Sequence, residues 1–248
     1  AIIQARSSST RLPGKVLLPL INKPMILFQL ERIKKSNTLD QIILATSDER
    51  TDDKLAKLVE KDGYLCFRGS LKNVLKRYAD CINYFPFDVV VRITGDCPLM
   101  DPKLIDEIVL YYLQNDFQYI SNSIDEKNLS VPDGFDIEVF DSSILAKALE
   151  KAKLKSQKEH VTPWFRTKAA EINWTHFIHS KIRKFYRLTV DDLADYEVIC
   201  SIVKELYAQN RNFDLDEVID FLNRNPHIAK KNIDSIRNEG YLNSLKKD

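Results

Sequence analysis

The chain has 248 residues, and 44% of them are hydrophobic, so it can bury a large core and is not expected to be disordered. Its 37 Lys and Arg residues nearly cancel its 36 Asp and Glu residues, and the net charge of +1 gives no overall attraction for nucleic acid or an anionic membrane. Apolar stretches such as 105–113 are far shorter than the roughly 20 residues that a membrane span needs.

Strand-like apolar runs alternate with helix-period segments over the first half of the chain, a pattern typical of βαβ units and a mostly parallel sheet. The predicted strands are 1–5, 41–46, 64–67, 88–93 and 117–121. One predicted helix has Pro24 at its first position, and another begins near Thr51 and is closed by Gly63. Two more helices are predicted at 73–83 and after Pro102.

The second half is less regular. Acidic and hydrophobic residues alternate over 135–140, which predicts a strand with Asp136 and Glu138 on one face. Further predicted elements are helices at 142–153, 157–168, 193–209 and 214–223, strands at 172–178 and 185–190, and a polar tail that frays. Because no linker or repeat interrupts the chain, we predict one domain, 1–248. It comprises a nucleotide-binding half (1–120), an inserted arm (121–184), and a last core strand with C-terminal helices (185–248).

The most informative segment is QARSSSTRLPGK, the first loop (residues 4–15), which combines three cations, four hydroxyl groups and Gly14. Small residues let backbone N–H groups approach an anion, while Arg6, Arg11 and Lys15 can form charge-assisted bonds to a polyphosphate. The GxxxxGK[ST] pattern of a Walker A loop is absent. We interpret the loop as a phosphate-binding site; a solvated basic loop is the alternative.

Six segments in order, with a similar tail, resemble the SpsF-type (spore-coat polysaccharide) cytidylyltransferases, relatives of the CMP-Kdo and CMP-acylneuraminate synthetases. They are AIIQARSSSTRLPGKVLLPL, FRGSLKNVLKRY, VVVRITGDCPLMDP, DGFDIEVF, EHVTP and RLTVDDLADYE, and the tail is IRNEGYLNSLKKD. The resemblance implies a glycosyltransferase-A-like three-layer α/β/α sandwich with an inserted arm. It also implies an enzyme that joins CTP to a sugar or sugar-acid-like acceptor and releases pyrophosphate with the help of Mg²⁺.

Catalysis of this kind depends on positioning the triphosphate and neutralising its charge. The catalytic residues expected from the first loop and the TGDCP turn are Arg6, Arg11, Lys15 and Asp96. Asp96 follows a predicted central strand, where ligands of open α/β sheets bind, and Mg²⁺ favours one or two carboxylates. By resemblance, Asp96 and Asp191 are the metal ligands. Asp192 is the alternative to Asp191, unless it caps the next helix.

Residues at the ends of the first strands are candidates for binding the nucleotide. The predicted nucleotide-binding set is Gln4, Ala5, Arg6, Ser9, Arg11, Gly14, Lys15, Ala45, Ser47, Gly69, Ser70, Arg77 and Thr94. Thr94 stands where the sugar-acid synthetases often carry Gln, which weakens the transfer of their base contacts to this chain.

The acceptor is expected on the later segments. The predicted acceptor-binding residues are Asp133, Asp136, Glu138, Glu159 and His160. Alternatively, Asp136 and Glu138 lie on a solvated strand face. His160 either binds substrate or accepts a proton, or else it is simply hydrogen-bonded near a helix start.

These observations predict a Mg²⁺-dependent cytidylyltransferase that activates a small acidic or phosphorylated sugar-like acceptor for bacterial surface polysaccharide. Four cysteines without a CxxC pair argue against a zinc site or disulfide scaffold and favour the cytoplasm. A homodimer is expected, with 164–165 and 172–178 as candidate contact surface. The alternatives are a glycosyltransferase of the same fold that uses a nucleotide sugar, and a non-catalytic assembly subunit. No nucleic acid or membrane partner is expected.

Overall fold

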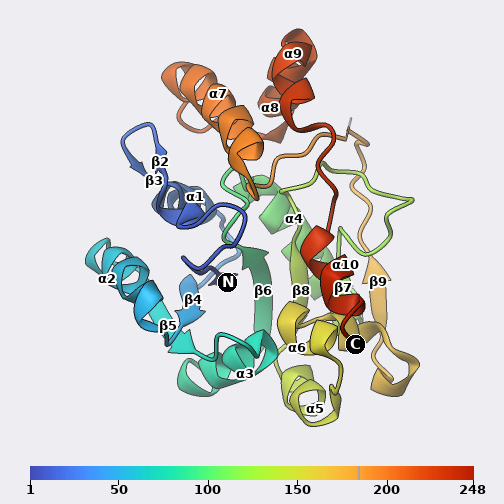
Figure 1. Cartoon of the computed structure of the whole chain (residues 1–248). Helices are drawn as coiled ribbons and strands as arrows, with labels where there is room; N and C mark the ends of the chain where they lie inside the picture. Colours follow the sequence, from blue (N-terminus) through green and yellow to red (C-terminus); the bar gives the residue numbers. More distant parts are fainter. Residues whose placement is uncertain (184) are drawn as a thin grey trace.

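The computed structural model describes residues 1–183 and 185–248, so residue 184, the last of the predicted arm, lies outside the described residues. Within them, seven strands form one sheet in the order β5-β4-β1-β6-β8-β7-β9, and β2 and β3 form a hairpin (Figure 1). The strands are β1 (Ile2–Gln4), β2 (Pro19–Leu20), β3 (Lys23–Pro24), β4 (Ile43–Ser47), β5 (Leu65–Gly69), β6 (Val89–Thr94), β7 (Tyr119–Ser121), β8 (Glu138–Asp141) and β9 (Trp174–His176).

Helices connect most of these strands. The α-helices are α1 (Met25–Ile33), α2 (Asp53–Lys61), α3 (Val74–Tyr84), α4 (Pro102–Leu113), α5 (Ser143–Lys151), α6 (Lys155–His160), α7 (Leu193–Gln209), α8 (Leu215–Arg224), α9 (Pro226–Ala229) and α10 (Glu239–Leu245). Short 3-10 turns are η1 (Lys15–Leu17), η2 (Arg50–Asp52), η3 (Pro163–Arg166), η4 (Lys168–Ala170) and η5 (Lys230–Asn232). None of the helices in the described residues is long and apolar enough to cross a membrane.

The sheet is mostly parallel, as the sequence predicts. β1 runs parallel to β4 and β6, β4 runs parallel to β5, and only β8 is antiparallel to its neighbours β6 and β7. Ile3 pairs with Leu44 on one side and Ile93 on the other. The carboxyl ends of the central strands therefore meet at one edge of the sheet, the edge at which ligands of such folds bind.

Both faces of the sheet are covered by helices, which explains why the strands are almost continuously apolar. Ile3 belongs to one buried cluster, together with residues of α1, α4, α7 and α8. The neighbouring Ile2 belongs to the opposite cluster, with residues of α3 and α5. The predicted three-layer α/β/α architecture is thereby confirmed.

Three predicted elements differ from the structure. The helix predicted at 157–168 ends at His160, because Val161 has a positive φ of 71° and Pro163 begins a 3-10 turn instead. The strand predicted at 185–190 is reduced to one bridge between Asp133 and Arg187. The Leu188 N–H of this segment donates to the Asp133 carbonyl, whereas the Val190 N–H donates to the Asp96 carbonyl. Because these bonds go to different parts of the chain, no ladder with a single strand forms. The polar tail, for which the sequence analysis predicts no helix, contains α9 and α10, and its final residues 246–248 lie beyond α10.

Part of the predicted dimer surface is also wrong, because Trp164 and Phe165 lie in the core of the monomer. The Phe165 ring packs edge-on against Tyr119 and Phe140, with ring centroids 5.4 and 5.2 Å apart. Trp174 and Ile178, from the second predicted contact segment, remain exposed.

Gly134 fixes the position at which the arm passes the segment 185–190. Its φ is +95°, and a Cβ there would lie 2.4 Å from the carbonyl carbon of Leu188.

We expect Gly134→Ala to lower the free energy of unfolding by about 3 kcal/mol or more, because the cost of backbone strain adds to that of a clash with main-chain atoms. Urea unfolding measures this loss. Gly63→Ala, with φ +84° but open space, is the control, expected to lose about 1 kcal/mol; equal losses would contradict the clash.

Candidate active site

A cavity of about 1150 Å³ opens at the carboxyl ends of β1 and β6. Its lining includes most of the residues predicted to bind ligands. These are Gln4, Ala5, Arg6, Ser9, Arg11, Lys15, Arg77, Thr94, Asp96, Asp133, Asp136, Glu138, Glu159, His160 and Asp191. The predicted residues Gly14, Ala45, Ser47, Gly69 and Ser70 are not part of this lining. The cavity therefore brings together predicted nucleotide-binding and predicted acceptor-binding residues, whereas part of the predicted nucleotide-binding set lies outside its lining.

The first loop is held in shape by its own backbone and by a buried carboxylate. The Gly14 N–H donates to the Ser7 carbonyl at 2.8 Å, which the φ of +70° at Gly14 permits. The Asp52 side chain is fully buried and accepts from the Ser7 N–H at 2.6 Å, and also from the Ser47 N–H and hydroxyl. Asp52 thus ties the loop to the end of β4.

Sequence reasoning missed Asp52, because an Asp at the start of a helix is usually an N-cap. Here its side chain makes no capping bond and turns toward the loop instead. The buried hydroxyls of Ser7 and Ser8 have no hydrogen-bond partner. Neither residue is part of the cavity lining, so these two hydroxyls do not face the cavity.

Lys15 joins the two carboxylates that were predicted as metal ligands. Its Nζ lies 3.0 Å from Asp96 Oδ2 and 3.0 Å from Asp191 Oδ1, and it donates to the Val190 carbonyl at 2.7 Å. Burial by itself lowers the pKa of Lys15, but Asp96 and Asp191 raise that pKa above its usual range. Burial likewise raises the pKa of Asp96, but Lys15 holds it below its usual range. The ammonium and the Asp96 carboxylate are therefore both charged at neutral pH.

Two arginines complete this cluster around Asp191. Arg11 Nη2 lies 2.8 Å from Asp191 Oδ1, and Arg187 Nη2 lies 2.8 Å from Asp191 Oδ2. The neighbouring Asp192 faces elsewhere: it accepts from the Asp195 N–H at 3.0 Å and caps α7. The structure thus places Asp191 on the cavity wall and Asp192 at the helix cap.

The donor set fits a magnesium ion that is shared with a phosphate ligand. Asp96 and Asp191 contact the same ammonium, so their oxygens converge on one point. Among the described residues, no group of three or more His, Cys, Asp or Glu side chains is arranged to hold a metal. Because Mg²⁺ accepts one or two carboxylates together with phosphate oxygens and water, two converging carboxylates are sufficient.

Arg77 and its neighbours form the opposite wall. The Arg77 guanidinium donates to the Ser70 carbonyl at 2.7 and 3.0 Å and reaches the Ala45 carbonyl at 3.4 Å. Burial lowers its pKa from the usual value. Arg77 therefore fastens the turn after β5 to strand β4, and its bonds engage the backbone carbonyls of Ser70 and Ala45.

Glu138 lies in the part of the cavity that the sequence predicts to bind the acceptor. It is buried, forms an ion pair with Arg92, and accepts from the Tyr119 hydroxyl at 2.6 Å. It also accepts from the Thr162 hydroxyl at 2.5 Å. Burial raises the pKa of Glu138, but Arg92 and the hydrogen bonds from Thr162 and Tyr119 together keep that pKa below its usual range. The alternative of a solvated strand face is wrong for Glu138.

Asp133 and Asp136 are paired with arginines from later segments. Asp133 Oδ2 lies 3.2 Å from Arg187 Nη1, and Asp136 Oδ1 lies 3.1 Å from Arg237 Nη2. Burial raises the pKa of Asp136 to about 7, although Arg237 opposes this rise. Asp136 therefore changes its protonation near neutral pH.

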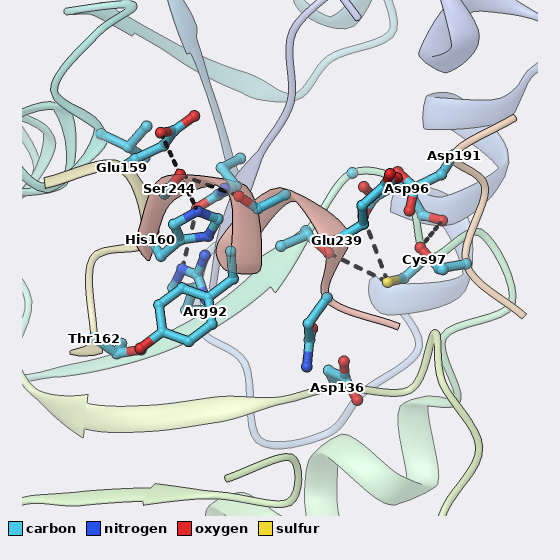
Figure 2. A pocket seen from close by; sticks show the side chains of 18 of the residues that line it. Arg92, Asp96, Cys97, Asp136, Glu159, His160, Thr162, Asp191, Glu239 and Ser244 are labelled. Carbon is cyan, nitrogen blue, oxygen red and sulfur yellow. Dashed lines mark hydrogen bonds between the residues drawn. The ribbon is translucent and has the colours of Figure 1, made fainter. Parts of the chain in front are cut away.

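His160 and Glu159 meet the C-terminal helix α10, as Figure 2 shows. Ser244 Oγ donates to Glu159 Oε2 at 2.7 Å and lies 3.2 Å from His160 Nε2. Burial lowers the pKa of His160 to about 4, so this imidazole is neutral at pH 7. At the other end of the cavity, Glu239 forms an ion pair with Arg11. Sequence reasoning assigned no role to Ser244 or Glu239, although both lie in the tail segment that resembles the family.

A family model described as "Cytidylyltransferase" matches residues 1–225. An uncharacterized protein of Methanocaldococcus jannaschii is 40% identical over 97% of this chain and 96% of its own length. The spore coat polysaccharide biosynthesis protein SpsF of Bacillus subtilis is 35% identical over 92% of this chain and 95% of its own length.

Solved structures agree with this match. A cytidylyltransferase from Leptospira borgpetersenii has a TM-score of 0.85 and 33% identity, and covers 92% of this chain and 94% of its own. The CMP:2-keto-3-deoxy-manno-octonic acid synthetase, solved in complex with CTP, has a TM-score of 0.63 and covers 84% of this chain and 97% of its own. At 19% identity, the second likeness shows the fold alone.

The raised pKa of Asp136 predicts a pH-dependent stability. An unfolded Asp titrates near pH 4, whereas folded Asp136 titrates near 7, so the folded state binds the extra proton between these values. Stability is therefore lost as pH rises from about 4 to about 7. We expect Asp136→Asn to match the wild type near pH 4 and to be about 1–2 kcal/mol more stable at pH 8, a value reduced for the partial exposure of the carboxyl.

Urea unfolding at both pH values tests this expectation. Asp192→Asn is the matched control, since Asn caps a helix about as well as Asp, and it should show little change at either pH. A less stable Asp136→Asn protein at pH 8 would show that the ion pair with Arg237 dominates instead.

Proposed function

Since the chain belongs to the cytidylyltransferase family, we propose that it transfers the cytidylyl group of CTP to a sugar or sugar-acid-like acceptor, with Mg²⁺, and releases pyrophosphate. A free hydroxyl acceptor would give a CMP-activated product, and a phosphorylated acceptor a CDP-activated one. The product would serve in surface polysaccharide synthesis, the process named for the relative SpsF.

The observation that carries this proposal is the cluster of Lys15, Arg11, Asp96 and Asp191 at one end of a large cavity. Two cations from the first loop meet two carboxylates from later segments. A triphosphate needs cations for its oxygens, and a metal that bridges phosphates needs carboxylates. This end of the cavity offers both, and the opposite end is free for an acceptor.

In the proposed mechanism, Lys15 and Arg11 bind phosphate oxygens and hold the α-phosphorus facing the acceptor end. Asp96 and Asp191 keep the Lys15 ammonium charged and oriented, and they are also the residues that would hold Mg²⁺. A bound magnesium ion would neutralise charge on the triphosphate and on the departing pyrophosphate. Most of the catalysis then comes from positioning, because the acceptor oxygen must lie in line with the leaving group.

The acceptor end suits a hydroxylated, acidic compound. Tyr119, Ser123, Thr162 and Arg166 are among the residues that line it. The Arg166 guanidinium is the group that we propose for a carboxylate or phosphate of the acceptor. As proton acceptor at neutral pH, Asp136 with a pKa of about 7 is better matched than His160 with a pKa of about 4.

The family match favours nucleotidyl transfer over a glycosyltransferase or an assembly subunit. The same proposal includes the cytoplasm as the site of action and a homodimer as the working form. Exposed Trp174 and Ile178 supply the remaining candidate contact surface of the dimer.

The nucleotide assignment predicts that the protein binds CTP with Mg²⁺ at least about tenfold more tightly than ATP, GTP or UTP. Calorimetric titration with each nucleotide measures this preference. Pyrophosphate release, measured with CTP and a panel of sugar acids and sugar phosphates, then identifies the acceptor. Equal affinities for the four nucleotides, or a preference for a purine, would remove the CTP assignment.

The two carboxylates predict a second result. Asp96→Asn and Asp191→Asn each replace an ionic oxygen ligand by a neutral one, and because Mg²⁺ has few protein ligands, we expect a loss of at least about a hundredfold in pyrophosphate release. The loss should persist at every magnesium concentration. Asp192→Asn is the control and should stay near wild type, because it only caps α7. An active Asp191→Asn protein beside an inactive Asp192→Asn protein would show that Asp192, and not Asp191, is the metal ligand.

A further inference from the structure

The C-terminal helix α10 forms one wall of the cavity, although it lies beyond residues 1–225 that the family model matches. In Figure 1 it is the short red helix near α6, and in Figure 2 it crosses between the two ends of the site. Residues of this segment that line the cavity are Asn238, Glu239, Gly240, Tyr241, Asn243, Ser244 and Lys247. The tail is therefore part of the site and not an appendage.

Polar contacts hold α10 in place. Glu239 pairs with Arg11 at its start, Ser244 contacts His160 and Glu159, and the Asp248 side chain accepts from the Ser156 N–H at 2.8 Å. Of the less polar side chains of the helix, Leu242 and Leu245 remain 44% and 43% exposed, and Tyr241 packs edge-on against His160 with ring centroids 5.1 Å apart. Because water can replace polar contacts at small cost, α10 can leave the wall far more easily than a helix packed by a hydrophobic stripe.

Glu239 competes with the proposed ligand for the same cation. Arg11 is shared between Asp191 and Glu239, and these side chains are partly exposed at the mouth of the first loop. A triphosphate bound to this loop would claim Arg11, and its negative charge would repel the Glu239 carboxylate. Arg11 therefore cannot form a full ion pair with the triphosphate and with Glu239 at the same time.

We propose that Glu239 latches α10 onto the cavity in the nucleotide-free enzyme, and that the triphosphate of CTP displaces Glu239 from Arg11 and loosens the helix. This inference rests on the proposed function and adds a control to the same site: nucleotide binding at one end changes the wall of the acceptor end. The ion pair between Glu239 and Arg11 is weak, because exposed ion pairs are screened by water and salt.

The test is calorimetric titration of CTP and Mg²⁺ into wild type and Glu239→Gln. Without the competing carboxylate, Glu239→Gln should bind CTP about three- to tenfold more tightly, and the gain should shrink as salt increases. Glu126→Gln is the matched control, because Glu126 also lines the cavity and accepts from Asn238 at 3.3 Å but lies outside the Arg11 cluster. It should change CTP affinity by less than about twofold.

A variant of Arg11 tests whether the gain in CTP affinity comes from the latch. In an Arg11→Ala background, Glu239→Gln should improve CTP binding by less than about twofold, because the ion pair that it relieves is already gone and only screened repulsion of the triphosphate remains. Hydrogen exchange of the wild type should also show faster exchange of backbone amides in 239–245 when CTP is added, with α8 unchanged. Slower exchange in 239–245 would mean that α10 closes on the nucleotide, and this would overturn the latch.

Failure of the latch and failure of the proposed function give different results. Equal or weaker CTP binding by Glu239→Gln, beside a wild type that binds CTP, overturns the latch alone. A gain of undiminished size in the Arg11→Ala background also overturns it. If neither wild type nor Glu239→Gln binds CTP, the proposed function and the latch fall together.

Discussion

The contact of the Lys15 ammonium with Asp96 and Asp191 is the interaction on which the site depends. It joins the first loop, the turn after β6 and the segment that precedes α7, three parts of the chain that are distant in sequence. Lys15 is almost fully buried, and a buried ammonium is stable only with compensating charge. The two carboxylates supply it, and the same arrangement gives them a common focus for a metal.

The other buried charges of the cavity follow the same rule. Arg92 neutralises Glu138 on the floor of the acceptor end. Arg187 contacts three carboxylates at 2.8 to 3.2 Å, those of Asp133, Asp191 and Asp195. Removing one member of such a buried group typically costs about 3–5 kcal/mol, because it leaves an uncompensated charge. The cavity can therefore be polar and still belong to a stable fold.

The cavity also joins the α/β sheet to the C-terminal tail. The sheet and the first loop lie within residues 1–225, which the family model matches, whereas α10 lies outside them. Arg92 connects the two ends of the cavity, since its Nε donates to Gln4 at 3.1 Å while its Nη1 pairs with Glu138.

Local pattern determined the parallel strands, most helix positions, the basic and hydroxyl-rich composition of the first loop and the place of Asp96 at a strand end. These features depend on periodicity and on residue types a few positions apart, which a sequence displays directly. Only the tertiary structure decided that Asp191 and not Asp192 faces the cavity, that Asp52 holds the first loop, and that the tail forms a wall. Lys15 and Asp191 are separated by 176 positions, and Arg11 and Glu239 by 228. Contacts over such separations are set by how the layers pack, and no local pattern encodes them.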